Sequence, residues 1–530
     1  MSRKNMHFGL MSALVAISLL LSACAPATAT LTEAPATATL TEAPATTAPA
    51  VEVTLYTVAP SPIKEADVER VQEAVSAMLK QKGVNVDLKI VAYDWGSAGD
   101  KINATLSTGE PCDLMFTSPW FNSFTEGVSK GYYLPLDDLL ASEAPELLTK
   151  YAKVWDVARV GGKIYAVPNQ QIWPRAYTFY IGTDILDKYP VDWDTIGNGI
   201  QGLKDMLPYA KTVLAGEPHL LAFIPGGVSG LGGSGGPNES EVFGYSRVVG
   251  GFAPFVVKYD DPAMKVVLEP EAPYFLELAQ VAREYTLNKI TLSSDLTPDE
   301  LMAAFKATPP KFVGEFWMFA PGMWPPIPQP YYNNRVFDGK RWLGANFLDT
   351  SGIQATLTAI CSTSPHPAEA LQVLNLLHTD AEIHNTVTFG VEGQDWLWVD
   401  KATKEIKYPE GTDVAQPPYL LYDWMMGDTF LNYYLNHEMA QADPNKAAAE
   451  INNTAPASVV LGFVFDPTPV SAEMAQISAV VTEEYMPIVT GRVENPEEMV
   501  AKYLRDLKAA GADTVLAEIQ RQIDAWAAAK

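Results

Sequence analysis

The stretch VEVTLYTVAPSPIKEADVERVQEAVSAMLKQKGVNVDLKIVAY, residues 51–93, decides the fold class of this chain. Residues 51–58 alternate apolar and polar side chains, which predicts a half-buried strand. Residues 62–82 change to the helical period, and Gly83 supplies a stop. One face of that predicted helix is apolar and carries Val68, Val71, Val75, Met78 and Leu79. Residues 84–93 return to a strand pattern.

The pattern continues with a predicted helix at 99–107 and a predicted strand at 113–117. The order strand, helix, strand, helix, strand predicts a parallel sheet with right-handed crossovers, and therefore an α/β fold. About 480 residues follow the N-terminal region, which is too many for one ordinary hydrophobic core. We therefore expect at least two lobes.

Tryptophans follow two strands of this predicted sheet. The strand at 84–93 leads into Asp94 and Trp95, and the strand at 113–117 leads into Ser118 and Trp120. Ligands of such sheets bind beyond the carboxyl ends of the strands. A sugar ring stacks its C–H face on an aromatic ring, and its hydroxyls bond to neighbouring polar groups. These four residues are therefore candidate ligand contacts; the alternative is that the tryptophans pack beneath the loops as core.

The N-terminus has the layout of an export signal. Arg3 and Lys4 precede an apolar run at 8–21, and Leu21-Ser22-Ala23-Cys24 resembles a bacterial lipobox. We therefore expect cleavage after residue 23 and acylation of Cys24 with palmitate-type chains, which would hold the protein on a membrane. The alternative is an ordinary signal peptide with an incidental cysteine.

A Thr/Pro/Ala tract occupies residues 24–50. The nonapeptide PATATLTEA occurs at 26–34 and again at 35–43. Such a composition cannot bury enough apolar surface to fold, so it predicts a disordered tether between the membrane and the globular part.

The net charge and the cysteines argue against nucleic-acid binding and against a zinc site. Without residues 1–23 the chain has 35 basic and 63 acidic side chains, a net charge of −28. This charge argues against binding to nucleic acid. Cys112 and Cys361 remain after Cys24; they can pair outside the cytoplasm or remain as two buried thiols, and they lack the spacing of a zinc site.

Several motifs, in order, resemble the extracellular solute-binding lipoproteins of bacterial ABC importers, especially the carbohydrate-binding ones. They are VSKGYYLPLDDLL at 128–140, GGKIYAVP at 161–168, YIGTDILDKYPVDWDTI at 180–196, TSPHPAEALQVLNLLHTDAEIHNTVTFGVEG at 363–393 and most of 462–526. The resemblance implies a two-lobe periplasmic-binding-protein-like fold of type II, with hinge crossings and C-terminal helices. It also implies an ABC permease as partner, a monomer, and a location on the extracytoplasmic face of the membrane.

The resemblance also suggests how the chain is divided. The segments are 1–23 signal, 24–50 tether, 51–170 first part of lobe 1, 171–352 first part of lobe 2, 353–395 return to lobe 1, and 396–530 remaining lobe segments with C-terminal helices. The crossings are expected near 169–175 and 350–356.

Further candidate contacts lie at the first crossing and in the second lobe. Trp173 adjoins the crossing and is a candidate for the floor of a ligand cleft. The run GEFWMFAPGMWPPIPQPYY at 314–332 is too rich in aromatics and prolines for a helix or central strand. Glu315, Trp317 and Trp324 of this run are candidate ligand contacts, or else an aromatic cluster that shields a helix.

Chemistry-bearing motifs are weak. GLGGSG at 230–235 matches a dinucleotide-binding pattern but is followed by Pro237, and no helix begins there, so it predicts a surface loop. His378 and His384 do not form a zinc motif, and no nucleophile elbow appears. The sequence therefore predicts no catalytic residue, no metal and no cofactor.

We expect a receptor that captures an oligosaccharide. A peptide receptor of the same fold and a surface enzyme that cleaves glycans remain the alternatives.

Capping motifs predict helix boundaries near the end of the chain and in the second lobe. Asn495-Pro496-Glu497-Glu498 and Thr297-Pro298-Asp299-Glu300 each combine a cap residue, a first-turn proline and a third-position glutamate. Gly511 is expected to end the helix that begins after Asn495, and Asp513 to cap the last helix.

Overall fold

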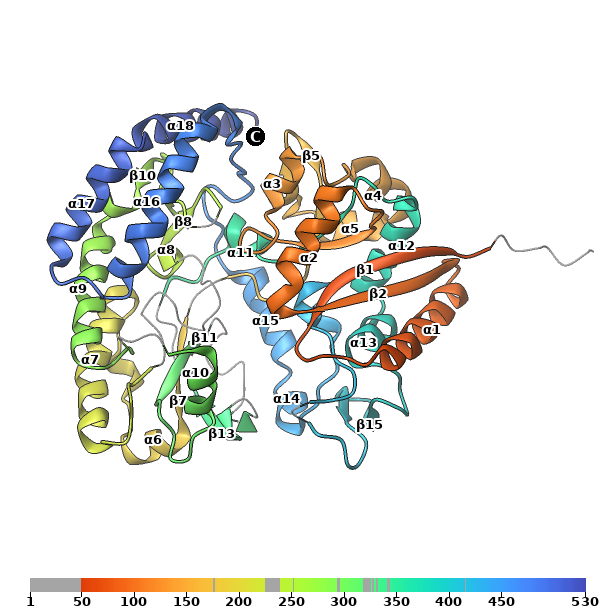
Figure 1. Ribbon diagram of the computed structural model, residues 1–530, viewed down its shortest axis with the longest axis horizontal. Coiled ribbons are helices and arrows are strands. Elements are labelled where there is room, and N and C mark those ends of the chain that lie inside the picture. Colours follow the sequence, from red (N-terminus) through yellow and green to blue (C-terminus); the bar gives the residue numbers. More distant parts are fainter. Residues whose placement is uncertain are drawn as a thin grey trace, which may run out of the picture. The chain divides into compact units, whose positions relative to one another are not determined.

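The computed structural model describes residues 49–530, apart from 175–176, 225–238, 251, 293–295, 318–325, 327, 330–331, 341–343 and 415. The predicted signal peptide, Cys24 and most of the tether therefore lie outside the described residues, as does the glycine-rich run at 230–235. From Pro49 onward the chain forms one unit. It contains two α/β lobes, each with its own β-strands and hydrophobic core (Figure 1).

Lobe 1 is built on a five-stranded sheet of order β2-β1-β3-β14-β6. The strands are β1 (Val51–Ala59), β2 (Val86–Asp94), β3 (Leu114–Thr117), β14 (Leu357–Ile360) and β6 (Ala166–Pro168). β1 pairs parallel with both β2 and β3, as the sequence predicts. β14 is antiparallel to β3 and β6, because it returns from lobe 2 to enter the sheet.

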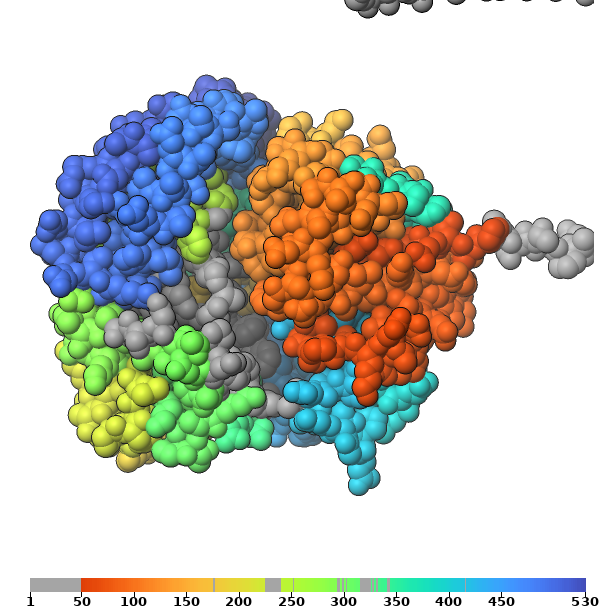
Figure 2. Space-filling model, viewed as in Figure 1, coloured from red at the N-terminus to blue at the C-terminus, as the bar shows by residue number. Residues whose placement is uncertain are grey.

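Helices cover both faces of this sheet. They are α1 (Glu65–Gln81), α2 (Trp95–Thr108), α3 (Phe124–Ser129), α4 (Asp137–Glu143), α5 (Pro145–Lys150), α12 (Pro367–Thr379) and α13 (Ala381–Phe389). α1 buries Val71, Val75 and Leu79, three members of its predicted apolar face, and lies beside α13 (Figure 1). The surface of lobe 1 therefore combines early residues, orange in Figure 2, with cyan residues from near 400.

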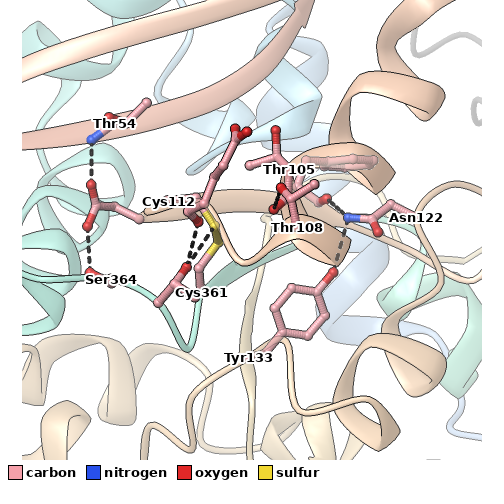
Figure 3. Close-up of a disulfide and its surroundings, with 12 residues drawn as sticks. Thr54, Thr105, Thr108, Cys112, Asn122, Tyr133, Cys361 and Ser364 are labelled. Atoms are coloured by element: carbon pink, nitrogen blue, oxygen red, sulfur yellow. Dashed lines mark hydrogen bonds between the residues drawn. A yellow bond between two sulfur atoms is a disulfide. The ribbon is translucent and has the colours of Figure 1, made fainter.

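A disulfide joins Cys112 to Cys361 across 249 residues of sequence (Figure 3). Cys112 precedes β3 and Cys361 follows β14, the two strands that pair side by side. The Asp113 carboxylate adds a second connection here: it accepts from Thr54 N at 2.8 Å and from Ser364 Oγ at 2.5 Å. The sequence left the pairing open, and the structure resolves it in favour of the disulfide.

Lobe 2 contains two sheets. The first has the order β11-β7-β13-β12 and the second β10-β9-β8. Their strands are β7 (Thr178–Gly182), β11 (Gly314–Trp317), β12 (Pro328–Gln329), β13 (Arg335–Asp338), β8 (Tyr245–Arg247), β9 (Phe255–Lys258) and β10 (Val266–Leu268). The helices are α6 (Thr183–Lys188), α7 (Gly199–Gly216), α8 (Glu239–Val242), α9 (Pro273–Leu287) and α10 (Pro298–Phe305).

The C-terminal helices complete the core of lobe 2. α16 (Ser471–Val489), α17 (Pro496–Ala509) and α18 (Ala512–Ala528) pack with one another, and α16 and α17 contact α9 (Figure 1). Asn495 caps α17 by accepting from Glu498 N at 3.2 Å. Thr297 and Glu300 form the predicted reciprocal cap at α10.

The cap predicted for the last helix is wrong. Gly511, at φ 93°, follows the end of α17 and immediately precedes α18, so Asp513 lies inside the first turn and caps nothing. One left-handed glycine reverses the chain here, which leaves no room for a separate cap residue.

Three segments connect the lobes. The first follows β6 and leads to β7, and the second contains α11 (Thr350–Gln354), which leads to β14. The third follows α14 (His437–Ala442) and α15 (Pro444–Thr454) and pairs with the second: Leu348 N donates to Pro456 O, and Ser458 N donates to Leu348 O, both at 2.8 Å. Short hairpins β4–β5 (Arg159–Val160, Lys163–Ile164) and β15–β16 (Leu397–Asp400, Glu405–Lys407) complete the fold.

Candidate functional site

Trp95 and Trp120 come together at the carboxyl edge of the lobe 1 sheet. Trp95 is the first residue of α2, directly after β2, and Trp120 follows β3. Their ring centroids lie 6.0 Å apart, with 27° between the ring planes. The side chains are 41% and 38% exposed, far above the buried tryptophans of the core. An exposed pair of large rings at this edge is available to a ligand.

Neighbouring groups hold both rings in place. Phe121 stacks on Trp95 at 5.8 Å and 18°. The Trp120 indole donates from Nε1 to Ala355 O at 2.8 Å, directly after α11. Because the polar edge of Trp120 is satisfied by the backbone, its ring face remains for apolar contact.

Two aromatic residues of this site were missed by sequence reasoning. Tyr422 and Trp424 lie at the 3₁₀ turn η5 (Asp423–Met425), about 300 residues later in the chain. The Trp424 ring lies 6.0 Å from Trp120 and 6.1 Å from Trp95, and the Tyr422 ring lies 5.8 Å from Trp95. The signal was the aromatic run YLLYDWMM at 419–426, which no local pattern connects to the sheet edge. We call Trp95, Trp120, Phe121, Tyr422 and Trp424 the aromatic platform.

Asp94 and Ser118 support the platform through local hydrogen bonds. Asp94 caps α2 by accepting from Ser97 N at 3.0 Å and from the Ser97 hydroxyl. These bonds from Ser97, with Lys101 nearby, lower the pKa of the Asp94 carboxyl, which is exposed and ionised. Ser118 is buried; its hydroxyl donates to Phe121 O and accepts from Phe121 N, both at 2.9 Å. Ser118 therefore fixes the turn that presents Trp120.

Trp173 lies at the first crossing and packs into the core of lobe 1. It is 7% exposed and its ring lies 6.4 Å from that of Tyr151. Its indole donates to Asn169 O at 3.3 Å, and its backbone N–H donates to Asn452 Oδ1 at 2.9 Å. These contacts tie the first crossing to α15.

The second-lobe candidates are only partly described. Glu315 and Trp317 belong to β11, whose backbone pairs antiparallel with β7; their side chains lie outside the described part of the chain, as does all of Trp324.

The rings of the platform are uncharged. Such a surface is suited to a neutral ligand that has apolar faces and many hydroxyls. Within the described ranges, no group of three or more His, Cys, Asp or Glu side chains is arranged to hold a metal ion. In the same ranges, no helix is both long and apolar enough to cross a bilayer.

Comparisons with known proteins agree with this description. A curated relative, the carbohydrate ABC transporter substrate-binding protein of Streptococcus pneumoniae, is 24% identical over 454 residues, which cover 84% of this chain and 85% of the relative. Residues 459–528 match a family model described as a domain of unknown function, DUF3502.

Solved structures show the same fold. The N-glycan transport solute-binding protein NgtS of Streptococcus pneumoniae superposes with a TM-score of 0.72 at 20% identity, covering 89% of this chain and 98% of NgtS. Its complex with Man5GlcNAc superposes with a TM-score of 0.68 at 21% identity, covering 91% and 99%. The chain thus has the two-lobe fold of solute-binding proteins, as the sequence predicts.

Proposed function

We propose that this chain is the solute-binding component of a bacterial ABC importer, and that it captures an oligosaccharide and delivers it to the permease. Its similarity to a carbohydrate substrate-binding protein extends over most of both chains. That relative and NgtS are both binding proteins. The observation that carries the proposal is the exposed aromatic platform at the carboxyl edge of the lobe 1 sheet.

Stacking supplies the affinity in this proposal. The pyranose C–H face is apolar and rests on an indole, while its hydroxyls are bonded by polar groups at the rim. Asp94, ionised and exposed beside Trp95, is the proposed acceptor for a ligand hydroxyl. Ser118 contributes by holding Trp120 and Phe121 in place.

The second lobe is proposed to close over the ligand. Glu315, Trp317 and Trp324 are the proposed contacts from that side, and Trp173 supports the floor at the crossing. A ligand that touches both lobes stabilises the closed arrangement, since only that arrangement provides both sets of contacts. The permease would then recognise the closed form of the protein.

The solute-binding component of an ABC importer captures its ligand outside the cytoplasm, so the proposed function implies an extracytoplasmic location. The Cys112–Cys361 disulfide is compatible with that compartment. We further propose that Cys24 carries acyl chains and that the tether at 24–50 separates the lobes from the membrane, with the protein acting as a monomer. In this proposal Cys24→Ala releases the protein from the membrane fraction; retention of the variant on membranes would contradict it.

A thermal-shift screen with oligosaccharides, including Man5GlcNAc, and with peptides tests the function. A ligand at 100 times its Kd should stabilise the folded protein by about 2.7 kcal/mol. Trp95→Ala and Trp120→Ala should each weaken binding by about thirtyfold, the cost of a central aromatic contact. Trp526→Ala is the matched control, since this ring packs on Phe463 of the lobe 2 core.

Two outcomes of the screen oppose the proposal. A thermal shift with peptides alone would show that the ligand is a peptide and not an oligosaccharide. Equal loss of binding in Trp526→Ala and in the platform variants would show that the platform is not the ligand site.

A further inference from the structure

The segment that presents Trp424 crosses the edge of lobe 1 and is fastened at both ends. Tyr422 N donates to Val58 O at 3.3 Å, at the end of β1. Beyond the turn, Gln170 N donates to Gly427 O and Thr429 N donates to Gln170 O, both at 2.9 Å. The segment therefore joins the sheet edge to the first crossing between the lobes.

Asp423 holds the middle of this segment. One carboxylate oxygen accepts from the backbone N–H of Trp424 at 2.9 Å, and the other accepts from Asn432 Nδ2. Burial raises the pKa of the Asp423 carboxyl, so this group depends on these donors in place of water.

Behind Asn432 lies a buried histidine on α13. His384 is fully buried; its Nε2 lies 2.8 Å from Asn432 Oδ1 and its Nδ1 lies 3.0 Å from Leu377 O. Both ring nitrogens face oxygen atoms, and a neutral imidazole carries one N–H; with that proton on Nε2, the ring donates to Asn432 Oδ1. Asn432 is 9% exposed and uses both ends of its amide, one toward His384 and one toward Asp423.

The backbone around Asn432 is fastened to the same helix. Asn385 of α13 donates from Nδ2 to Leu431 O at 2.9 Å, and its Oδ1 accepts from Tyr433 N at 2.8 Å. The base of Asn432 is therefore fixed independently of its amide, which leaves the amide to act on the turn.

We propose that Asn432 is a positioning residue of the ligand site: its amide connects His384 to Asp423 and thereby holds Trp424 against Trp95 and Trp120. Asn432 is buried behind the platform and does not itself contact the ligand. The proposal rests on the proposed function. It predicts that removing the amide releases the turn, so that Trp424 no longer completes the platform.

A double-mutant cycle on ligand affinity tests this role. Asn432→Ala should weaken oligosaccharide binding about tenfold in the wild-type background and less than twofold in a Trp424→Ala background, because Asn432 acts through Trp424. Asn375→Ala is the matched control: its amide donates to Glu146 at 2.9 Å on the outside of lobe 1, away from the platform, and affinity should not change.

Hydrogen exchange of the ligand-free proteins gives a second readout. The amides of 422–429 should exchange faster in Asn432→Ala than in wild type, while those of the lobe 2 core stay unchanged. If Asn432→Ala yields no folded protein, Asn432→Ser, whose hydroxyl cannot reach both partners, is carried through the same cycle with the same expectations.

The outcomes separate the two proposals. Equal loss of affinity in both backgrounds, or no loss in wild type, overturns the role of Asn432 and leaves the proposed function intact. Failure of the wild-type protein to bind any oligosaccharide overturns the proposed function and the role of Asn432 with it.

Discussion

Individual side chains at the platform differ in how their polar atoms are used. The Trp120 indole N–H donates to Ala355 O, whereas the Asp94 carboxylate accepts a hydrogen bond from Ser97 N. The sequence predicts that Asp94 and Ser118 lie at the sheet edge, and they do. It does not predict their hydrogen bonds, because caps and turns depend on backbone geometry that the residue types alone do not specify.

The tie to Ala355 gives a prediction for Trp120→Phe. Phenylalanine keeps an aromatic face but loses the N–H donor that fixes the ring. We expect ligand affinity to fall by less than in Trp120→Ala. The loss of affinity relative to wild type should appear mainly as a faster dissociation rate. Stopped-flow measurement of both rates checks this, and a Phe variant as weak as the Ala variant would contradict it.

His378 predicts a pH dependence of stability. It is fully buried, and burial together with the nearby Lys150 charge lowers its pKa well below the ordinary value. Below about pH 6.5 the unfolded state binds a proton that the native state does not. The stability that neutral His378 contributes is therefore present above that pH and lost as the pH falls.

Comparison with His378→Gln isolates this effect. Between pH 6.5 and 5.5, the free energy of unfolding of wild type should fall relative to the variant by about 1.0 kcal/mol. Above pH 7.5 the difference should be constant. Urea unfolding at each pH measures it, and a difference that stays constant down to pH 5.5 would show that native His378 takes up the proton.

At the scale of helices and strands, the sequence periodicity predicts the type of element correctly where one period dominates. The strand at 51–58 extends to Ala59, and the parallel pairing with β2 is as expected. The predicted helix at 62–82 begins instead at Glu65, and the helix expected at 99–107 begins already at Trp95 because Asp94 caps it. Trp424 could not be predicted, since its approach to Trp95 depends on how a distant segment crosses the sheet edge.

The disulfide supports the pairing of β3 with β14. Replacing Cys112 and Cys361 by alanine frees a loop of 249 residues in the unfolded chain and should cost about 2 to 5 kcal/mol in the free energy of unfolding. Denaturant unfolding with and without reductant measures this cost. The reductant should destabilise wild type and leave the variant unchanged; a variant as stable as oxidised wild type would contradict the expectation.

Gly427 allows the platform segment to approach the helices behind it. Its φ is 63°, and an added Cβ would lie 2.4 Å from Leu377 O and 2.8 Å from His384 Nδ1. Gly427→Ala should therefore destabilise lobe 1 and weaken ligand binding, because the segment must shift. Gly393→Ala is the control: it also has positive φ, but nothing lies within 4 Å of its added Cβ. Equal effects of the two variants on binding would count against the close approach.

At the scale of the whole molecule, the fold consists of two lobes joined by three connections. The platform lies in lobe 1, while the C-terminal helices complete lobe 2. If a ligand is held between the lobes, saturation should compact the protein. Small-angle scattering should show a smaller radius of gyration with ligand, and a Trp95→Ala/Trp120→Ala double variant at the same ligand concentration should show no change.

The central claim, reversible capture of an oligosaccharide on the platform, is tested most directly by calorimetric titration of the full-length protein with Man5GlcNAc and other oligosaccharides, followed by mass spectrometry of the recovered ligand. We predict saturable binding of one ligand per chain, with the recovered glycan unchanged in mass. No heat with any oligosaccharide, or recovery of shortened glycans, would contradict the account.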